Sequence, residues 1–413
     1  MAKVEEAETR KPLQTRPKLK WLVEDGALTS NWSLVQERIE SNPEEVKHVD
    51  ALTGRTVLHQ LCSVSYAPTK LLELVASLFP EATRVQENTY KATPLHIRCY
   101  TSQRSVKKVE TILKYMTEDD VLLKNLFGGT VLHSACNSNA DINVLKMLIA
   151  KNPRILLQKT HEYSHTAMTA LWQSYLQSIP GIMAIANILN GREVHTNLFD
   201  RFWEKVELLA CESYKLSPAY PGDVTNASPS ICNTNTADAD ADAEATNDTT
   251  AGDGEEVALD TRYLLHGMLF LRVDMKLAKV ALRLNPSWAR HADKNGDYVI
   301  HKIIKTLPFP NKNSEMIRDV LKCYPEAAGK ANLDGDLPLF LAIRDKLSWW
   351  NGVEEIVKAY PDALAMQDRV TGLFPSLLAA ANGGKVAIDT TYELLCAKPD
   401  LIKDAHDFTQ NMR

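Results

Sequence analysis

The chain has 413 residues, of which 45% are hydrophobic and 24% charged, and its formal net charge is -5. These values are ordinary for a soluble globular protein, and a chain of this length buries a large core without disulfides or a metal ion. The small negative net charge creates no general basic field, so the composition does not favour binding to nucleic acid or to a membrane surface.

The chain begins without an apolar stretch. Residues 1–30 are predicted to form a flexible N-terminal segment, and we expect no secretory leader there. The seven cysteines are an odd number, which indicates free thiols in a reducing compartment. We therefore expect a cytoplasmic protein, with the nucleus as an alternative because Arg16, Lys18 and Lys20 form a weak basic cluster.

From residue 31 onward the sequence repeats itself. One string occurs three times, as GRTVLHQLC at 54–62, KATPLHIRC at 91–99 and GGTVLHSAC at 128–136. Its histidines, His59, His96 and His133, are 37 residues apart. Weaker copies follow around Trp172, His301, Phe340 and Leu377. A fixed period of this length indicates a repeat architecture, in which each repeat is one supersecondary unit.

A second marker keeps the same register. Proline follows an apolar helical stretch in most repeats, at Pro43, Pro80, Pro153, Pro286, Pro325, Pro361 and Pro399. Proline ends a helix, so each of these residues marks the crossing from one repeat to the next. The two markers together predict about eight repeats, of which the first and the last are incomplete.

Each repeat is predicted to be a pair of helices preceded by a turn. Glycine supplies a positive φ for that turn, five residues before the histidine position, at Gly54, Gly128, Gly296, Gly335 and Gly372. Thr or Pro then opens a short first helix, and the second helix carries apolar residues three or four apart. Because no single pair hides its apolar face, the pairs must stack. The predicted fold class is an all-α helical-repeat solenoid.

The pattern resembles the ankyrin repeat. The core motif of that family, Thr-Pro-Leu-His-x-Ala, corresponds here to residues 93–98 and 130–135. The resemblance covers residues 31–413 apart from one insertion, with repeats of about 37 residues where the commonest ankyrin repeat has about 33. It implies a protein-binding scaffold, in which the histidine bonds to loop backbone and the small residue after it packs between helices.

The middle of the chain departs from the repeat. Residues 161–216 are irregular, with helical stretches expected around 182–189 and 198–216. Residues 217–260 contain ten Asp or Glu and no Lys or Arg, so we predict a disordered acidic insertion. The solenoid is thus divided into 31–216 and 261–413. Without the insertion the remaining chain has a net charge of +5, which suggests that the insertion competes with an acidic partner for a basic stack, or is merely solubilising.

Two sets of residues have the spacing of metal ligands. The His-x-x-Cys pairs beginning at His59, His96 and His133 belong to three different repeats, whereas a structural zinc site gathers its ligands in one cluster. We interpret them as structural and expect no metal or other cofactor. The alternative is a zinc-dependent peptidase that uses the string His161-Glu162-x-x-His165, with Glu162 as general base. The repeat register places this string in a turn, so we expect a non-catalytic protein.

The remaining function is binding by shape. In a helix-pair stack the concave face is formed by the turn tips and by the exposed side of the first helices. The candidate binding residues at these positions are Arg55, Tyr90, Tyr100, Phe127, Asn137, Lys305 and Arg344. Exposed aromatic and arginine side chains are frequent anchors of protein interfaces. We expect one or more protein partners, and neither nucleic acid nor a membrane.

Overall fold

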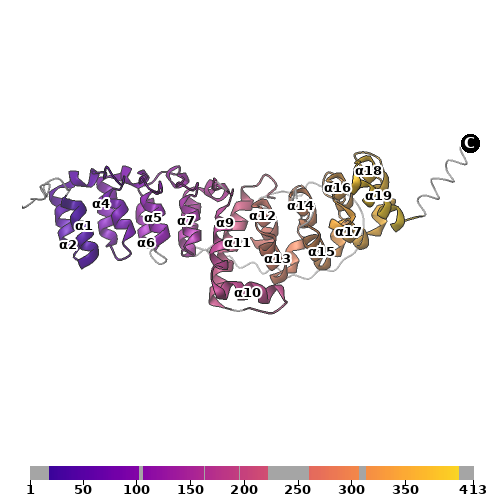
Figure 1. Cartoon of the computed structure of the whole chain (residues 1–413), viewed down its shortest axis with the longest axis horizontal. Helices are drawn as coiled ribbons and strands as arrows, with labels where there is room; N and C mark the ends of the chain where they lie inside the picture. The colour runs from indigo at the N-terminus through magenta and orange to yellow at the C-terminus, as the bar shows by residue number, and fades with distance from the viewer. Residues whose placement is uncertain are drawn as a thin grey trace, which may run out of the picture. The chain divides into compact units, whose positions relative to one another are not determined.

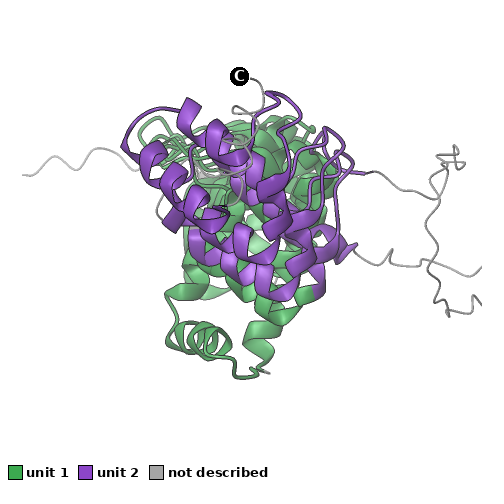
Figure 2. Cartoon of the chain, turned by 90° about the vertical axis from the view of Figure 1, so that its right-hand side faces the viewer, with its two compact units in different colours: residues 1–216, 267–286 green, residues 217–266, 287–413 purple. Residues whose placement is uncertain are grey.

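The computed structural model describes residues 18–101, 106–161, 163–194, 196–221, 260–306 and 313–399. In these ranges the elements are α-helices and short 3-10 helices, together with one isolated β-bridge between Ala292 and Tyr298. The predicted all-α class with helical repeats is confirmed. The chain divides into two compact units, residues 1–216 with 267–286 and residues 217–266 with 287–413 (Figure 2).

Unit 1 is built from helix pairs that follow one another in chain order (Figure 1). Its helices are α1 (Lys18–Thr29), α2 (Ser33–Ser41), α3 (Val57–Ser63), α4 (Thr69–Leu78), α5 (Pro94–Thr101), α6 (Val106–Leu113), α7 (Val131–Asn137), α8 (Ile142–Lys151), α9 (Ala167–Leu176), α10 (Ile179–Leu189), α11 (Asn197–Lys215) and α13 (Met275–Leu284). The first helices α3, α5, α7 and α9 pack side by side, and so do the second helices α4, α6 and α8. The division between the two units falls within α12 (Leu264–Phe270).

Unit 2 repeats the arrangement. Its helices are α14 (Val299–Thr306), α15 (Asn313–Cys323), α16 (Pro338–Arg344), α17 (Val353–Ala359), α18 (Pro375–Ala381) and α19 (Lys385–Ala397). Here α14, α16 and α18 pack in succession, and α15 packs on α17. First helices of seven or eight residues are too short to be stable alone in water, so stacking is what holds them in helical form.

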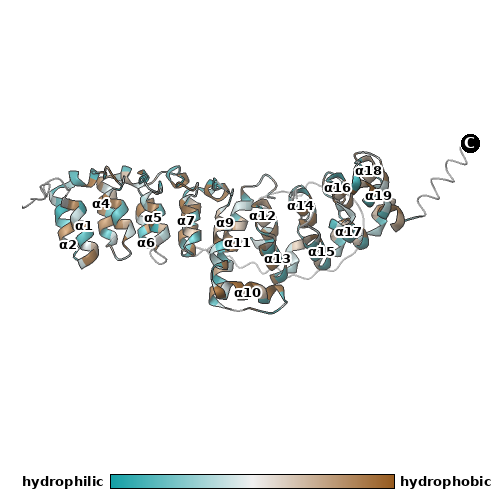
Figure 3. Ribbon diagram, in the orientation of Figure 1, coloured by the Kyte–Doolittle hydropathy of each residue, from teal (hydrophilic) through white to brown (hydrophobic). Residues whose placement is uncertain are grey.

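The core of the stack comes from the residue before each histidine position. Leu58, Leu95, Leu132, Ile300 and Leu339 occupy that position in five repeats and are fully buried. Burial of a side chain of this size contributes about 1.5–3 kcal/mol, so each of these five repeats supplies a similar amount. Figure 3 shows the result as hydrophobic faces that recur along the successive helices of each unit.

The repeating prolines begin short 3-10 helices. Pro43, Pro80, Pro153, Pro286, Pro325 and Pro361 are the first residues of η2 (Pro43–Lys47), η3 (Pro80–Arg84), η5 (Pro153–Leu157), η8 (Pro286–Arg290), η9 (Pro325–Gly329) and η11 (Pro361–Ala365). Proline suits the first position of a helix because its missing N–H would have no helical acceptor there. The repeat that contains α5 and α6 lacks this proline and has the shorter η4 (Asp120–Leu122) instead.

Two segments differ from the sequence-based expectation. Residues 18–29, placed in the flexible N-terminal segment, form α1, whose Leu19 and Val23 are buried. Residues 217–221, placed in the acidic insertion, are also packed: the amide of Lys294 donates to Ala219 (3.3 Å), and the Tyr220 ring contacts that of Tyr263 at a centroid distance of 6.0 Å. Apolar contacts hold both segments in place, although the charged residues around them had led us to predict no ordered structure there. Residues 1–17 and 222–259 lie outside the described residues.

The irregular region around α10 and α11 is held by aromatic side chains. The rings of Tyr175 and Phe202 stack with centroids 3.9 Å apart, and Trp172 and Phe199 contact the same Phe202 ring. This cluster joins α9 to the 19-residue helix α11. Helix α10 extends away from the row formed by α3, α5, α7 and α9 (Figures 1 and 2).

Candidate functional site

The turn before each first helix is organised by one polar acceptor. In the turn before α7, Oδ1 of Asn125 accepts the backbone N–H groups of Phe127 (3.1 Å) and Gly129 (2.9 Å). The same position is occupied by Asp50, Glu87, Asp293, Asn332 and Asp368, each of which accepts turn N–H groups. Sequence reasoning missed these residues. The signal was present as an acidic or amide residue eight or nine positions before each histidine position.

Successive turns are bonded to one another through the backbone. In unit 1 the amides of Asn88, Leu126 and His161 donate to the carbonyls of Thr53 (2.8 Å), Tyr90 (2.7 Å) and Phe127 (3.2 Å). In unit 2 the amide of Leu333 donates to Asn295 (2.9 Å). The turns of neighbouring repeats therefore lie edge to edge, and the side chains at their tips form one surface within each unit.

The repeating histidines hold the turns to the helices. In His59, Nδ1 accepts the backbone N–H of Thr56 (3.1 Å), and Nε2 donates to the carbonyl of Ala92 in the next repeat (3.2 Å). His96 and His133 bond in the same way to Gly129 and His165, and in unit 2 His301 bonds to Asp336. Both ring nitrogens are thus used, which leaves no lone pair on these rings for a metal ion.

Burial disfavours the charged forms of these histidines and of the repeat cysteines. Desolvation lowers the pKa of His59, His96, His133 and His266 to about 4, so their rings are neutral at physiological pH. Burial raises the pKa of the thiols of Cys62, Cys99 and Cys136 to about 12. A buried, protonated thiol is a poor nucleophile and a poor metal ligand, so the His-x-x-Cys pairs have the chemistry of a core.

The residues of the peptidase alternative lie in a turn. His161 and Tyr163 are turn residues, Ser164 has a φ of +51°, and Glu162 lies outside the described residues. The zinc-binding string requires a helix, in which residues four apart share one face. Here the His161 amide and the His165 carbonyl instead join this turn to the preceding repeat. Within the described part of the chain, no group of three or more His, Cys, Asp or Glu side chains is placed to hold a metal ion.

The candidate aromatic residues of unit 1 are exposed, and two of them are in contact. Tyr90, Tyr100 and Phe127 are 52%, 63% and 57% exposed. The rings of Tyr90 and Phe127 stack with centroids 6.3 Å apart and an interplanar angle of 28°. Arg55 is half-buried and Asn137 exposed in the same unit. The tip aromatics therefore pack on each other and still present more than half of their surface to solvent.

The candidate cations of unit 2 are engaged within the unit. Lys305 Nζ lies 2.7 Å from Oδ1 of the buried Asp297, which also accepts a hydrogen bond from Asn332 of the next turn (2.9 Å). Arg344 pairs with Asp336 and lies 3.9 Å from Asp368. Their partners Asp297 and Asp336 lie shortly before the first helices α14 and α16, and Asp368 is one of the turn acceptors described above. Lys305 and Arg344 contribute to holding the turns together, which their sequence positions did not indicate.

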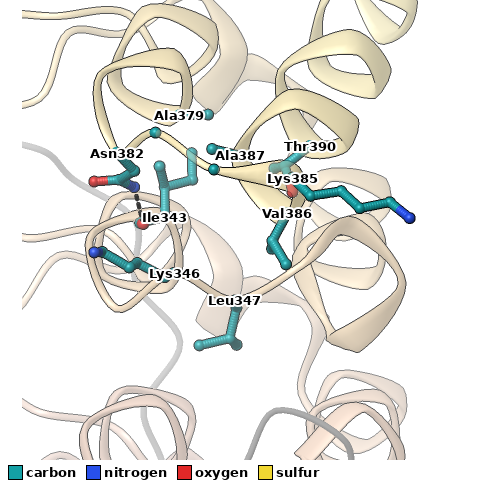
Figure 4. Close-up of a pocket in the computed structure, with 11 residues that line it drawn as sticks. Ile343, Lys346, Leu347, Ala379, Asn382, Lys385, Val386, Ala387 and Thr390 are labelled. Carbon is teal, nitrogen blue, oxygen red and sulfur yellow. Dashed lines mark hydrogen bonds between the residues drawn. The ribbon is translucent and has the colours of Figure 1, made fainter.

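One cavity of about 250 Å³ lies in unit 2 between α16, α18 and the start of α19 (Figure 4). Its walls are mainly apolar and include Ile343, Leu347 and Ala387. Asn382 donates to the carbonyl of Ile343 (2.6 Å), and the amines of Lys346 and Lys385 extend in opposite directions in Figure 4. The cavity therefore has no converging polar groups that would orient a ligand.

Comparison with known proteins adds little to this geometry. No family model matches the sequence, and no curated protein matches it. Among solved structures, an "Ankyrin repeat protein from Leishmania major" is 12% identical over 84% of this chain and 97% of that chain, with a TM-score of 0.33. A TM-score this low carries no argument, so the ankyrin resemblance rests on the sequence motifs. None of the described helices is long and apolar enough to span a bilayer.

Proposed function

We propose that the protein is a non-catalytic scaffold that binds a protein partner through the turn tips and first helices of its repeats. The observation that carries this proposal is the group of exposed aromatic side chains, Tyr90, Phe127 and Tyr100, on adjacent repeats of unit 1. Aromatic residues bury a large area at low entropic cost, which is why they anchor interfaces. A rigid backbone bonded from turn to turn keeps them in place before a partner arrives.

Affinity capture from native lysate tests the proposal. We expect wild-type protein to retain a reproducible set of partners and the double variant Tyr100→Ala/Phe127→Ala to lose most of it. A matched control replaces two exposed aromatic residues of unit 2, Trp350→Ala and Tyr392→Ala. Unchanged capture by the Tyr100→Ala/Phe127→Ala variant would remove this surface from consideration, and the absence of any reproducible partner would indicate a structural spacer.

A further inference from the structure

The tips of four consecutive turns in unit 1 each expose an apolar side chain. Leu52 and Tyr163 are 86% and 73% exposed, and Tyr90, Leu126 and Phe127 are each more than half exposed. We call these five residues the tip surface. Because the turn amides bond to the carbonyls of the preceding turns, the five side chains lie on one continuous edge. An exposed apolar row of this kind is typical of an interaction surface.

The exposed charged side chains that the structure describes in the same turns are basic. Arg55, Lys91 and Lys159 are half-exposed or exposed and form no ion pair with a described carboxylate. The acidic side chains that the structure describes in these turns are used internally, and Glu162 lies outside the described residues. Glu87 is fully buried and accepts the amides of Thr89 and Tyr90, and Asp50 pairs with Lys20. The tip surface is therefore apolar with a positive border.

We infer that the tip surface binds an extended, acidic peptide segment that carries aromatic or aliphatic side chains. This inference rests on the proposed scaffold function and assigns the chemistry of the partner. Acidic residues match Arg55, Lys91 and Lys159, and apolar residues cover the tips. Stacked helices lie about 8–10 Å apart. A polyproline II segment repeats its side-chain direction every three residues, or about 9 Å, so one face of it can meet successive turns.

Single-stranded nucleic acid is the other class of ligand that combines aromatic and basic residues. Two observations favour a peptide. Tyr90 and Phe127 already stack on each other, so no base can be inserted between their rings. Leu52 and Leu126 are aliphatic and offer no ring on which a base can stack. An oligonucleotide is accordingly included as a competing probe in the test.

Fluorescence anisotropy with the full chain and defined probes tests this inference. The probes are random copolymers of Glu and Tyr, poly-Glu, a copolymer of Lys and Tyr, and oligothymidylate. We expect saturable binding of the Glu–Tyr copolymer that weakens as salt is raised. The Tyr90→Ala/Phe127→Ala variant should bind it at least about tenfold more weakly, because anchor residues carry most of the affinity.

A second variant and a control separate the chemistry from the fold. Lys91→Glu/Lys159→Glu changes only exposed side chains, so it should fold normally and lose the salt-dependent part of binding. Leu333→Ala/Val370→Ala, which removes exposed apolar side chains from turn tips of unit 2, should bind as the wild type does.

Three results would overturn the inference: equal binding of the Glu–Tyr copolymer by the wild type and the Tyr90→Ala/Phe127→Ala variant, tighter binding of the Lys–Tyr copolymer, or tip-dependent binding of oligothymidylate in preference to the peptides. If lysate partners are lost in the Tyr100→Ala/Phe127→Ala variant while no acidic copolymer binds, the scaffold function stands and the acidic partner is wrong.

Discussion

Glycine at the turn is required by the neighbouring repeat as well as by its own backbone. Gly128 has a φ of +78°, and a Cβ added to it would lie 2.6 Å from the backbone nitrogen of His161 in the next turn. Gly372 occupies the same position of its turn with a φ of +69°, but a Cβ there would meet nothing within 4 Å. Substitutions at these two positions therefore separate the free-energy cost of a left-handed backbone from the cost of a close contact with the next turn.

We predict that Gly128→Ala lowers the free energy of unfolding by about 3 kcal/mol and Gly372→Ala by about 1 kcal/mol. Both variants force alanine into the left-handed region, but only the first displaces a neighbouring turn. Urea denaturation followed by circular dichroism measures the difference. Equal losses for the two variants would show that contact between the turns contributes nothing.

At the scale of elements, a buried carboxylate joins two turns of unit 2 to a first helix. Asp297 contacts Lys302 (3.4 Å) and Lys305 (2.7 Å) on α14 and accepts from Asn332 in the following turn. Burial opposes its ionisation, but hydrogen bonds from Lys305 and Asn332 hold the pKa of Asp297 below its ordinary value. The Asp297 carboxylate is thus ionised, and its charge is balanced by the two lysines of α14 and by the amide of Asn332.

We predict that Asp297→Ala costs about 3 kcal/mol of unfolding free energy, because it leaves Lys305 and the buried amide of Asn332 without their shared acceptor. Lys302 keeps its contact with Asp293 (2.6 Å). Lys305→Ala should cost less than about 1 kcal/mol, since Lys305 is partly solvated and Lys302 remains to compensate Asp297. Thermal unfolding of the two variants provides the comparison. A larger loss for Lys305→Ala would contradict this description of the cluster.

In unit 1, buried cationic side chains likewise join one repeat to the preceding one. Arg98, which stands where the ankyrin motif has alanine, is fully buried, and its Nη1 donates to the carbonyl of Val64 (3.3 Å). Lys108 Nζ donates to the carbonyl of Ser65 (2.5 Å). Both carbonyls follow the C-terminal end of α3, where cations are favoured by the helix dipole. The repeat therefore tolerates a large cation at a position that normally needs a small side chain.

At the scale of the whole molecule, the histidines make stability depend on pH. His59, His96 and His133 in unit 1 and His266 in unit 2 have their pKa lowered by burial from 6.5 to about 4. In the unfolded chain each imidazole takes up a proton below about pH 6.5. The folded chain resists that proton until about pH 4. The stabilisation is therefore complete above about pH 6.5 and is lost as the pH falls toward 4.

We predict that each of these histidines lowers the free energy of unfolding by about 2 kcal/mol at pH 5 relative to pH 8. A series of urea denaturation curves between these values measures the sum, and His96→Gln should reduce the pH dependence by one such step. An unfolding free energy that stays constant between pH 8 and pH 5 would show that these rings are not buried neutral.

The sequence alone determined the period, the helix pairs and the place of the glycines and histidines. These features follow from local physics: apolar spacing selects helices, proline ends them and glycine permits positive φ. The fold class was predictable for that reason. The exposure of the tip aromatics was also predictable in kind, since Tyr90 and Phe127 stand at turn positions.

Tertiary structure decided what each polar side chain does. Lys305 and Arg344 occupy positions equivalent to Tyr100, yet they pair with turn carboxylates while Tyr100 remains exposed. The decisive partners, such as Asn332 beside Asp297, come from the next repeat about 35 residues away, where no local pattern reveals them. Likewise, α1 is ordered because Leu19 and Val23 are buried by packing, which charge-rich flanking sequence conceals. Stacking brings distant acceptors together, and only coordinates show which of them meet.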